Sequence, residues 1–338
     1  MQDPWALIIA GPTASGKSAL ASMLAQRLGG VVINADSMQV YRELRVLTAR
    51  PSPEEEAAVP HALYGVRSAA DAGSVAWWRG AALTAMREAH DAGKLPILCG
   101  GTGMYFLSLT QGLSHIPTPS EAARAEARAL LAADGPQAMH AALADCDPRT
   151  AARLNPTDGQ RLARAWEVWR STGRGLADWQ SDPGQRAPWR FAAIRLDPPR
   201  EVLREAIAAR FAAMLKAGAL EEVRSLVALE LDPALPAMRA HGVPELSAYL
   251  RGEIALNEAI RRSELVTGQY TKRQATWFRH HDLAENFAAY IIDARFLCLA
   301  QLSERKQMDI LNFIRLLLDA ARHPALSVQS APTTILQA

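Results

Sequence analysis

A phosphate-binding loop is the part of this sequence that most directly indicates chemistry. The run from Gly11 to Ser18 satisfies the pattern G-x-x-x-x-G-K-[ST] and follows an apolar stretch at residues 6–10. In such a loop backbone N–H groups and a helix N-terminus surround an anion, the lysine adds positive charge and the last hydroxyl can ligate Mg²⁺. We therefore predict diphosphate or triphosphate binding in preference to a glycine-rich structural turn. The loop residues are Gly11, Pro12, Thr13, Ala14, Ser15, Gly16, Lys17 and Ser18.

Two other segments place polar groups directly after apolar, strand-like runs. Asp36 lies in Asn34-Ala-Asp-Ser-Met-Gln-Val-Tyr41, and Thr102 lies in Gly100-Gly-Thr-Gly-Met-Tyr-Phe106. The carboxyl ends of parallel strands share one rim of a sheet, so we expect both residues beside the phosphate loop. Asp36 could there bind Mg²⁺, accept a proton from a nucleophile, or only cap the next helix. Its position alone leaves these three roles open.

The elements that must position these residues alternate between strand and helix. After the first strand-like run comes a helical stretch with Leu20, Leu24 and Leu28 on one face, and then a second strand-like run. This alternation is typical of parallel βαβ units and predicts an α/β fold, a P-loop NTPase-like parallel sheet flanked by helices. The expected strands are residues 6–10, 31–34, 95–99 and 191–196.

A helical insertion is expected to interrupt the sheet domain. Its sequence is rich in alanine and arginine, is broken by glycine and proline, and gives way to a strand-like run only near Phe191. Long helices are expected at residues 200–229 and 257–279, and a further one at 309–322 before a polar end that we expect to be disordered. The predicted organisation is a catalytic core at 1–111 and 190–296, an insertion at 112–189, and a tail at 297–338 with no assigned role.

Composition narrows the function less than the motifs do. The 338 residues are 49% hydrophobic and 21% charged, as in a globular protein, and 37 Lys and Arg against 35 Asp and Glu do not indicate a nucleic-acid binder. Charge is uneven, however, because the stretch from Arg261 to His281 is strongly basic. We expect a cytoplasmic protein without membrane contact, since no targeting segment or long apolar run is present. We also expect a monomer. The three cysteines match neither a disulfide framework nor a zinc spacing.

Three further motifs complete a set of six. They are Thr48-Ala-Arg-Pro51, Gln160-Arg-Leu-Ala-Arg-Ala-Trp-Glu-Val168 and Thr271-Lys-Arg-Gln-Ala-Thr-Trp-Phe-Arg279. In their order and spacing, from about residue 6 to about residue 280, the six motifs resemble the bacterial tRNA dimethylallyltransferases. Two positions depart from that family. Leu47 replaces a glycine, and His241-Gly-Val-Pro-Glu245 replaces the commoner Ile-Gly-Tyr-Lys-Glu.

The resemblance implies transfer of a dimethylallyl group from dimethylallyl diphosphate to the N6 amine of adenosine 37, next to the anticodon of tRNA. The phosphate loop would then hold the leaving pyrophosphate, with Mg²⁺ at Ser18. By matching positions Asp36 is the base, Lys17, Thr102 and Arg210 assist, and the insertion binds the anticodon stem-loop. The expected tRNA contacts are Asp36, Ser37, Met38, Gln39, Thr102, Arg124, Gln160, Arg161, Leu162, Ala163 and Arg164.

Three alternatives share part of this pattern. An ATP-dependent small-molecule kinase would use the same loop and Mg²⁺, but it leaves the 160–164 motif and the basic carboxyl-terminal helix unexplained. A prenyltransferase acting on free AMP would need no RNA-binding insertion. An RNA-binding protein with a degenerate loop is disfavoured by the intact Lys17, Ser18 and Asp36. Because no motif lies after about Leu297, we expect that removing that tail leaves transfer activity within a few-fold.

Overall fold

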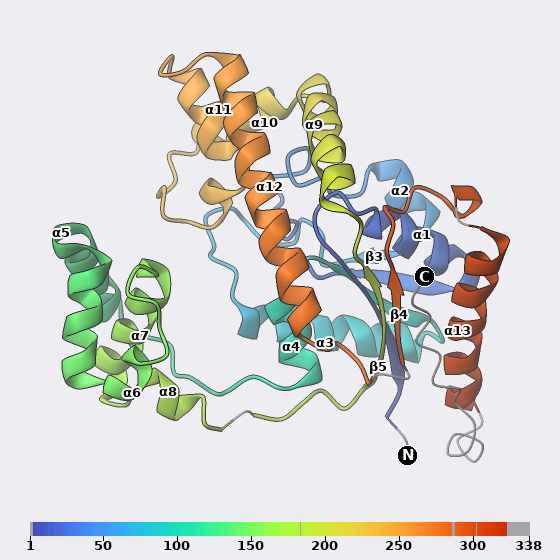
Figure 1. Cartoon of the computed structure of the whole chain (residues 1–338), viewed down its shortest axis with the longest axis horizontal. Coiled ribbons are helices and arrows are strands. Elements are labelled where there is room, and N and C mark those ends of the chain that lie inside the picture. Colours follow the sequence, from blue (N-terminus) through green and yellow to red (C-terminus); the bar gives the residue numbers. More distant parts are fainter. Residues whose placement is uncertain (1–2, 183, 286–287, 302, 323–338) are drawn as a thin grey trace. The chain divides into compact units, whose positions relative to one another are not determined.

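A parallel sheet organises the larger part of the chain, because its central strands are apolar on both faces. The computed structural model describes residues 3–182, 184–285, 288–301 and 303–322. Six parallel strands lie in the order β3-β2-β4-β1-β5-β6 (Figure 1). Along β1, Leu7 and Ile9 enter one apolar cluster while Ala6 and Ile8 enter another. The strands are β1 Trp5–Ala10, β2 Gly30–Asn34, β3 His61–Ala62, β4 Leu95–Gly100, β5 Arg190–Leu196 and β6 Ala289–Ile292.

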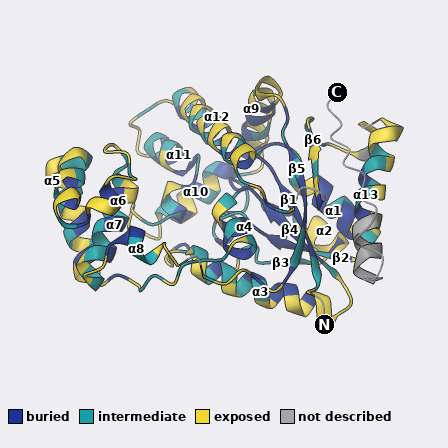
Figure 2. Cartoon of the chain, turned by 60° about the horizontal axis from the view of Figure 1, so that its bottom comes forward, coloured by how far each residue is buried: buried dark blue, intermediate teal, exposed yellow. Residues whose placement is uncertain are grey.

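Helices cover both faces of this sheet, and Figure 2 shows the strands buried between helices whose outer sides are exposed. Helices α1 and α13 contribute to the cluster of Leu7, whereas α3, α4 and α12 contribute to the cluster of Ile8. A third apolar cluster joins α9, α10 and α11 to the loop after β2. The helices are α1 Lys17–Leu28, α2 Pro53–Ala58, α3 Val75–Asp91, α4 Gly103–Thr110, α9 Arg200–Lys216, α10 Ala219–Val227, α11 Val243–Leu250, α12 Leu256–His280 and α13 Glu304–Arg322, with short 3-10 helices at Ala237–Arg239 and Leu299–Gln301.

The four expected strands are confirmed, and β3 and β6 are additions. Both additions are at sheet edges, where β3 has two residues and β6 alternates exposed and buried side chains, so neither has a long apolar run. The prediction of one continuous helix at 200–229 is wrong, because the structure has two helices there, α9 and α10. Gly218 separates them in the left-handed region, with φ of 96°, which glycine adopts without steric cost.

The second compact unit is helical and comprises Gln111–Arg186. Its core is a separate apolar cluster that includes Met139, Leu143 and Leu162. Gly135, with φ of 78° and ψ of 177°, kinks the long helix ahead of Pro136. The expected insertion ran to residue 189, but Ala187 and Trp189 are buried in the sheet unit. The helices are α5 Glu121–Cys146, α6 Pro148–Ala151, α7 Gly159–Thr172 and α8 Leu176–Trp179.

The carboxyl-terminal segment packs onto the sheet as far as α13 is described. Ile310 and Ile314 of α13 are 1% and 3% exposed and belong to the same apolar cluster as Leu20 and Leu24 of α1. Removal of the tail after Leu297 would uncover this core and lower stability, and the expectation that transfer activity stays within a few-fold remains a prediction. The polar end, residues 323–338, lies outside the described residues. No described helix is long and apolar enough to cross a membrane.

Candidate active site

The phosphate loop leaves β1 at the centre of the sheet and turns into α1. Gly16 caps α1 with φ of 91°, and Ala14 also lies in the left-handed region with φ of 65°. The Ser15 N–H donates to the Pro12 carbonyl at 3.2 Å, which closes the turn. The flanking strands β4 and β5 end beside β1, so the loop lies at the carboxyl rim of the sheet as predicted. Ser18 is exposed at the first turn of α1.

Gln274 of α12 connects this loop to the segment after β4. Its Oε1 accepts hydrogen bonds from the Thr13 N–H at 2.9 Å and the Thr13 hydroxyl at 3.2 Å. Its Nε2 donates to the Gly101 carbonyl at 2.9 Å, and the side chain is 5% exposed. One buried amide therefore ties α12, the phosphate loop and the Gly101 turn into a single arrangement.

Lys17 is surrounded by opposing electrostatic influences. Burial lowers the pKa of its ammonium group, while the nearby Asp36 carboxylate acts in the opposite direction. Burial also lowers the pKa of Arg210, and again Asp36 opposes the shift. The Lys17 ammonium donates to the Pro12 carbonyl at 3.3 Å. Lys17 and Arg210 thus place two positive charges near the single negative charge of Asp36. A polyanion bound at the loop would neutralise the excess positive charge.

Asp36 is held at the end of β2 by its own neighbours. Its N–H donates to Asn34 Oδ1 at 2.8 Å, and its Oδ1 accepts from the Met38 N–H at 2.9 Å. Within the described part of the chain, Oδ2 has no hydrogen-bond partner. No helix begins after Asp36, because residues 35–50 form turns before α2, so capping of a following helix is excluded. The carboxylate is therefore fixed through one oxygen while the other can receive a proton.

Thr102 lies beside Asp36 and completes this rim. The Ser37 N–H donates to the Thr102 hydroxyl at 2.9 Å, and the Thr102 N–H donates to the Ala35 carbonyl at 3.2 Å. Gly100 makes this approach possible, since a Cβ there would overlap the Ala35 carbonyl. The structure thus brings Asp36, Ser37 and Thr102 together, as the sequence predicted.

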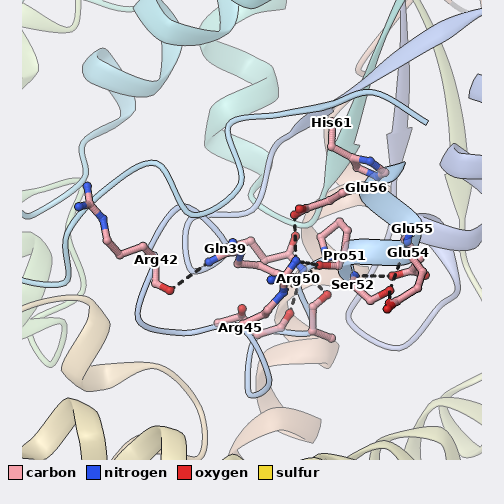
Figure 3. Close-up of polar contacts among 12 residues, drawn as sticks. Gln39, Arg42, Arg45, Arg50, Pro51, Ser52, Glu54, Glu55, Glu56 and His61 are labelled. Carbon is pink, nitrogen blue, oxygen red and sulfur yellow. Dashed lines mark hydrogen bonds and ion pairs between the residues drawn. The ribbon is translucent and has the colours of Figure 1, made fainter. Parts of the chain in front are cut away.

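Polar contacts hold the loop after β2 in shape (Figure 3), and Arg210 binds the backbone of this loop. Gln39 Nε2 donates to the Thr48 and Ala49 carbonyls at 2.8 and 2.9 Å, and Arg210 Nη2 donates to the same Thr48 carbonyl at 3.3 Å. Arg50 binds the Tyr41 carbonyl at 3.2 Å and closes the loop on itself. Gln39 and Arg50 therefore hold the loop in shape, a role that their family motifs did not indicate.

The two departures from the family pattern pack against each other. Leu47 is 7% exposed, and its side chain would be 3.0 Å from a Cβ at Gly242. Glu222 fixes this part of the loop, because its carboxylate accepts the N–H groups of Arg45, Val46 and Leu47 at 2.6, 2.7 and 2.9 Å. The two departures thus meet in an apolar contact between Leu47 and the backbone at Gly242.

An aromatic pair lies near the same carboxylate. The rings of His241 and Tyr270 meet edge to face with centroids 4.8 Å apart. Burial raises the pKa of Tyr270 to about 12 and lowers that of His241, and both groups interact electrostatically with Asp36. At neutral pH the phenol stays protonated, so it can donate a hydrogen bond but cannot supply a second negative charge.

In the helical unit, four of the five residues of the 160–164 motif have side chains that solvent reaches. Gln160 and Arg161 are exposed near the start of α7, whereas Ala163 and Arg164 are half-buried. The side chain of Leu162 is fully buried in the core of this unit, so a contact of this residue with RNA would have to use its backbone. Arg124 of α5 is also half-buried, and it pairs with Glu121 at 2.7 Å.

A Mg²⁺ site would depend on the substrate for most of its ligands. No group of three or more His, Cys, Asp or Glu suited to a metal occurs among the residues that the structure describes. Ser18 offers an exposed hydroxyl at the start of α1, beside the anion-binding turn. This donor set fits Mg²⁺, which commonly uses one or two protein ligands together with substrate phosphates and water.

Two buried amides at this rim were not recognised from sequence. The sequence gives Gln274 only as a member of the motif at residues 271–279, and Asn34 only as a member of the motif around Asp36. Asn34 Nδ2 donates to the Asp36 and Leu63 carbonyls at 3.0 and 3.1 Å and is fully buried. A polar amide at the end of an apolar strand is a usable signal, since a buried amide needs partners.

Comparisons with known sequences agree with this geometry. A profile of the IPP transferase family matches residues 39–281, and an isopentenyl transferase profile matches residues 5–72. The chain is 61% identical over 316 residues to the tRNA dimethylallyltransferase of Granulibacter bethesdensis, covering 93% of this chain and 99% of that protein. It is 58% identical over 317 residues to the tRNA dimethylallyltransferase of Gluconobacter oxydans, covering 94% and 96%.

Solved structures give the same fold. The full-length tRNA isopentenylpyrophosphate transferase of Bacillus halodurans superposes with a TM-score of 0.67 at 32% identity, covering 96% of this chain and 99% of that one. A eukaryotic dimethylallyltransferase, solved in crystallographic snapshots of its action on tRNA, superposes with a TM-score of 0.73. At 24% identity, over 97% of this chain and 86% of that one, the second likeness concerns the fold alone.

Proposed function

This chain belongs to the IPP transferase family and transfers a dimethylallyl group to tRNA, and we propose the chemical details of that reaction. The donor is dimethylallyl diphosphate, and the acceptor is the N6 amine of adenosine 37, next to the anticodon. The products are N6-dimethylallyladenosine and pyrophosphate. The observation that carries this proposal is the position of Asp36, Thr102 and the phosphate loop on one rim of the sheet.

Asp36 acts as the general base. An exocyclic adenine amine is a weak nucleophile because its lone pair is delocalised into the ring. Asp36 would accept an N6 hydrogen bond, orient the lone pair toward the allylic carbon and take the proton as the C–N bond forms. The free Oδ2 and the fixed Oδ1 support this role, since the carboxylate is held in place while one oxygen stays available.

The phosphate loop stabilises the departing pyrophosphate. Its N–H groups, Lys17 and Arg210 supply positive electrostatic potential where negative charge develops as the C–O bond breaks. Mg²⁺, held by Ser18 and the diphosphate, would add further charge stabilisation. The burial that lowers the pKa values of Lys17 and Arg210 also strengthens their attraction to an anion, because it removes competing water.

The helical unit binds the anticodon stem-loop. Single-stranded loop bases are recognised when they are splayed out of the stack, so the target adenine would be extruded toward Asp36. Arg124, Arg161 and Arg164 are cations of this unit, and the electrostatic effect of Arg124 on the pKa of Arg164 indicates that these two are neighbours. They would contact the phosphate backbone. The expected location in the cytoplasm and the monomeric state stay predictions.

One experiment distinguishes this function from its alternatives. The protein is incubated with Mg²⁺ and labelled dimethylallyl diphosphate, together with total tRNA, AMP or ATP. We expect label in tRNA alone, at the adenosine next to the anticodon after nuclease digestion. Label in AMP would instead indicate a mononucleotide prenyltransferase, and phosphate transfer from ATP without prenylation would indicate a kinase.

A further inference from the structure

The segment after β6 crosses the outside of the phosphate loop. The Phe296 N–H donates to the Ser15 carbonyl at 2.9 Å, and Arg295 Nε donates to the Ala14 carbonyl at 3.0 Å. Gly16 leaves room for this contact, since a Cβ there would overlap the Phe296 carbonyl. Consecutive carbonyls of the loop are therefore bound from one side by residues 281 positions later in the chain.

The contact with the Ser15 carbonyl orients an N–H group that would meet a diphosphate, and the contact with the Ala14 carbonyl fixes the peptide before it. In a trans peptide the C=O and N–H bonds point in opposite directions. The peptide that carries the Ser15 carbonyl also carries the Gly16 N–H, so fixing the carbonyl outward turns that N–H to the other side. The Ala14 carbonyl shares its peptide with the Ser15 N–H, which closes the loop on the Pro12 carbonyl at 3.2 Å.

Helix α13 holds the segment in place. Phe296 is 1% exposed and shares its apolar cluster with Ile310 and Ile314 of α13. Lys306 pairs with Asp293 at 3.0 Å, and the rings of Tyr290 and Phe313 lie 5.7 Å apart. Figure 1 and Figure 2 both show α13 beside α1, the helix that starts at the phosphate loop.

We propose that residues 293–296, supported by α13, are a positioning element that keeps the phosphate loop in its anion-binding conformation. The proposal rests on the proposed function in assigning the diphosphate of the donor to that loop. The segment lies beyond residue 281, where the family profile ends. Arg295 is the residue that tests it best, because it is half-buried and outside the apolar cluster, so its replacement leaves the core packing intact.

The test compares two replacements of Arg295 in the full-length protein. R295L removes the hydrogen bond to Ala14, whereas R295Q removes the charge but keeps an N–H donor. Calorimetric titration with inorganic pyrophosphate and Mg²⁺ should give a Kd raised about 3- to 10-fold in R295L, the range of one lost hydrogen bond. R295Q should recover most of that affinity. The KM for dimethylallyl diphosphate should follow the Kd, with transfer at saturating donor and tRNA affinity unchanged.

Two control variants separate positioning from general effects. V32A cuts the same apolar cluster at β2, away from α13 and the phosphate loop, so it should lower the thermal midpoint but leave pyrophosphate affinity within about 2-fold. R305L removes an exposed cation of α13 and should change neither quantity. Wild-type affinity in R295L would overturn the proposal, and so would equal losses in R295L and R295Q, which would indicate a charge effect instead. If wild-type protein binds pyrophosphate but does not prenylate tRNA, the proposed function fails and the positioning element stands.

Discussion

Burial changes the pKa of Lys17, the lysine of the phosphate loop. Desolvation favours its neutral form, while Asp36 favours the charged form, and desolvation is the larger influence because the pKa is lowered. The charged form is the one that attracts diphosphate. Below the lowered pKa the ammonium is charged and donor binding is complete, whereas above it the charge is lost and binding weakens.

We therefore predict that the KM for dimethylallyl diphosphate rises at alkaline pH, before an ordinary lysine would lose its proton. Above the lowered pKa the loss approaches about tenfold per pH unit, the fraction by which the charged form decreases. K17R should remove this dependence, because a guanidinium stays charged throughout the range. A pH profile that is identical in wild-type protein and K17R would show that Lys17 does not set donor affinity.

The second prediction concerns the uncharged side-chain amide of Gln274, which joins the phosphate loop to the Gly101 turn through hydrogen bonds. Q274A leaves the Thr13 N–H without its acceptor and the Gly101 carbonyl without its donor. Unsatisfied buried groups cost about 1–3 kcal/mol, so we expect lower stability and a KM for the donor raised roughly tenfold. Q269A, at an exposed position of the same helix, is the matched control and should behave as wild type. Unchanged donor kinetics in Q274A would mean that α12 does not organise the loop.

At the level of elements, the strands that carry the site could be predicted from sequence and the tertiary contacts could not. β1, β2 and β4 are apolar runs followed by glycine or polar residues, and this local pattern located the phosphate loop, Asp36 and Thr102. Gln274 and residues 295–296 meet the loop only after long stretches of chain have folded, so no local pattern identifies them. The burial of the Leu162 side chain could not be predicted, because a motif match does not show which side of a helix is buried.

The helical unit yields a prediction about RNA affinity. Replacing Arg124 and Arg161 with alanine should weaken tRNA binding and lower the slope of log affinity against log salt by up to about two, since each phosphate contact contributes roughly one. Pyrophosphate affinity should stay unchanged, because both arginines lie in the unit without the phosphate loop. R170A is the matched control, as it removes a cation paired with Glu126 at the other end of α7. Loss of donor affinity with intact tRNA affinity would contradict this assignment.

At the scale of the whole molecule, the proposed function assigns donor binding and the grip on the anticodon arm to different compact units. The sheet unit contains the phosphate loop, Asp36, Thr102 and Arg210, whereas the helical unit contains Arg124 and the 160–164 motif. The division explains how a loop pattern common among nucleoside triphosphatases can serve prenyl transfer. In the proposed function the loop supplies only an anion site, and the insertion binds the acceptor tRNA.

Single-turnover transfer by D36N tests the central claim, that Asp36 is the base, most directly. Asparagine keeps an oxygen for the Met38 N–H, so the turn after β2 should survive. It cannot accept the N6 proton, so with saturating tRNA and donor we predict a rate lowered by roughly 10²–10⁴-fold. Pyrophosphate affinity should change little, because the loop is untouched. A folded D36N protein that transfers at nearly the wild-type rate would show that Asp36 is not the base and would contradict the mechanism.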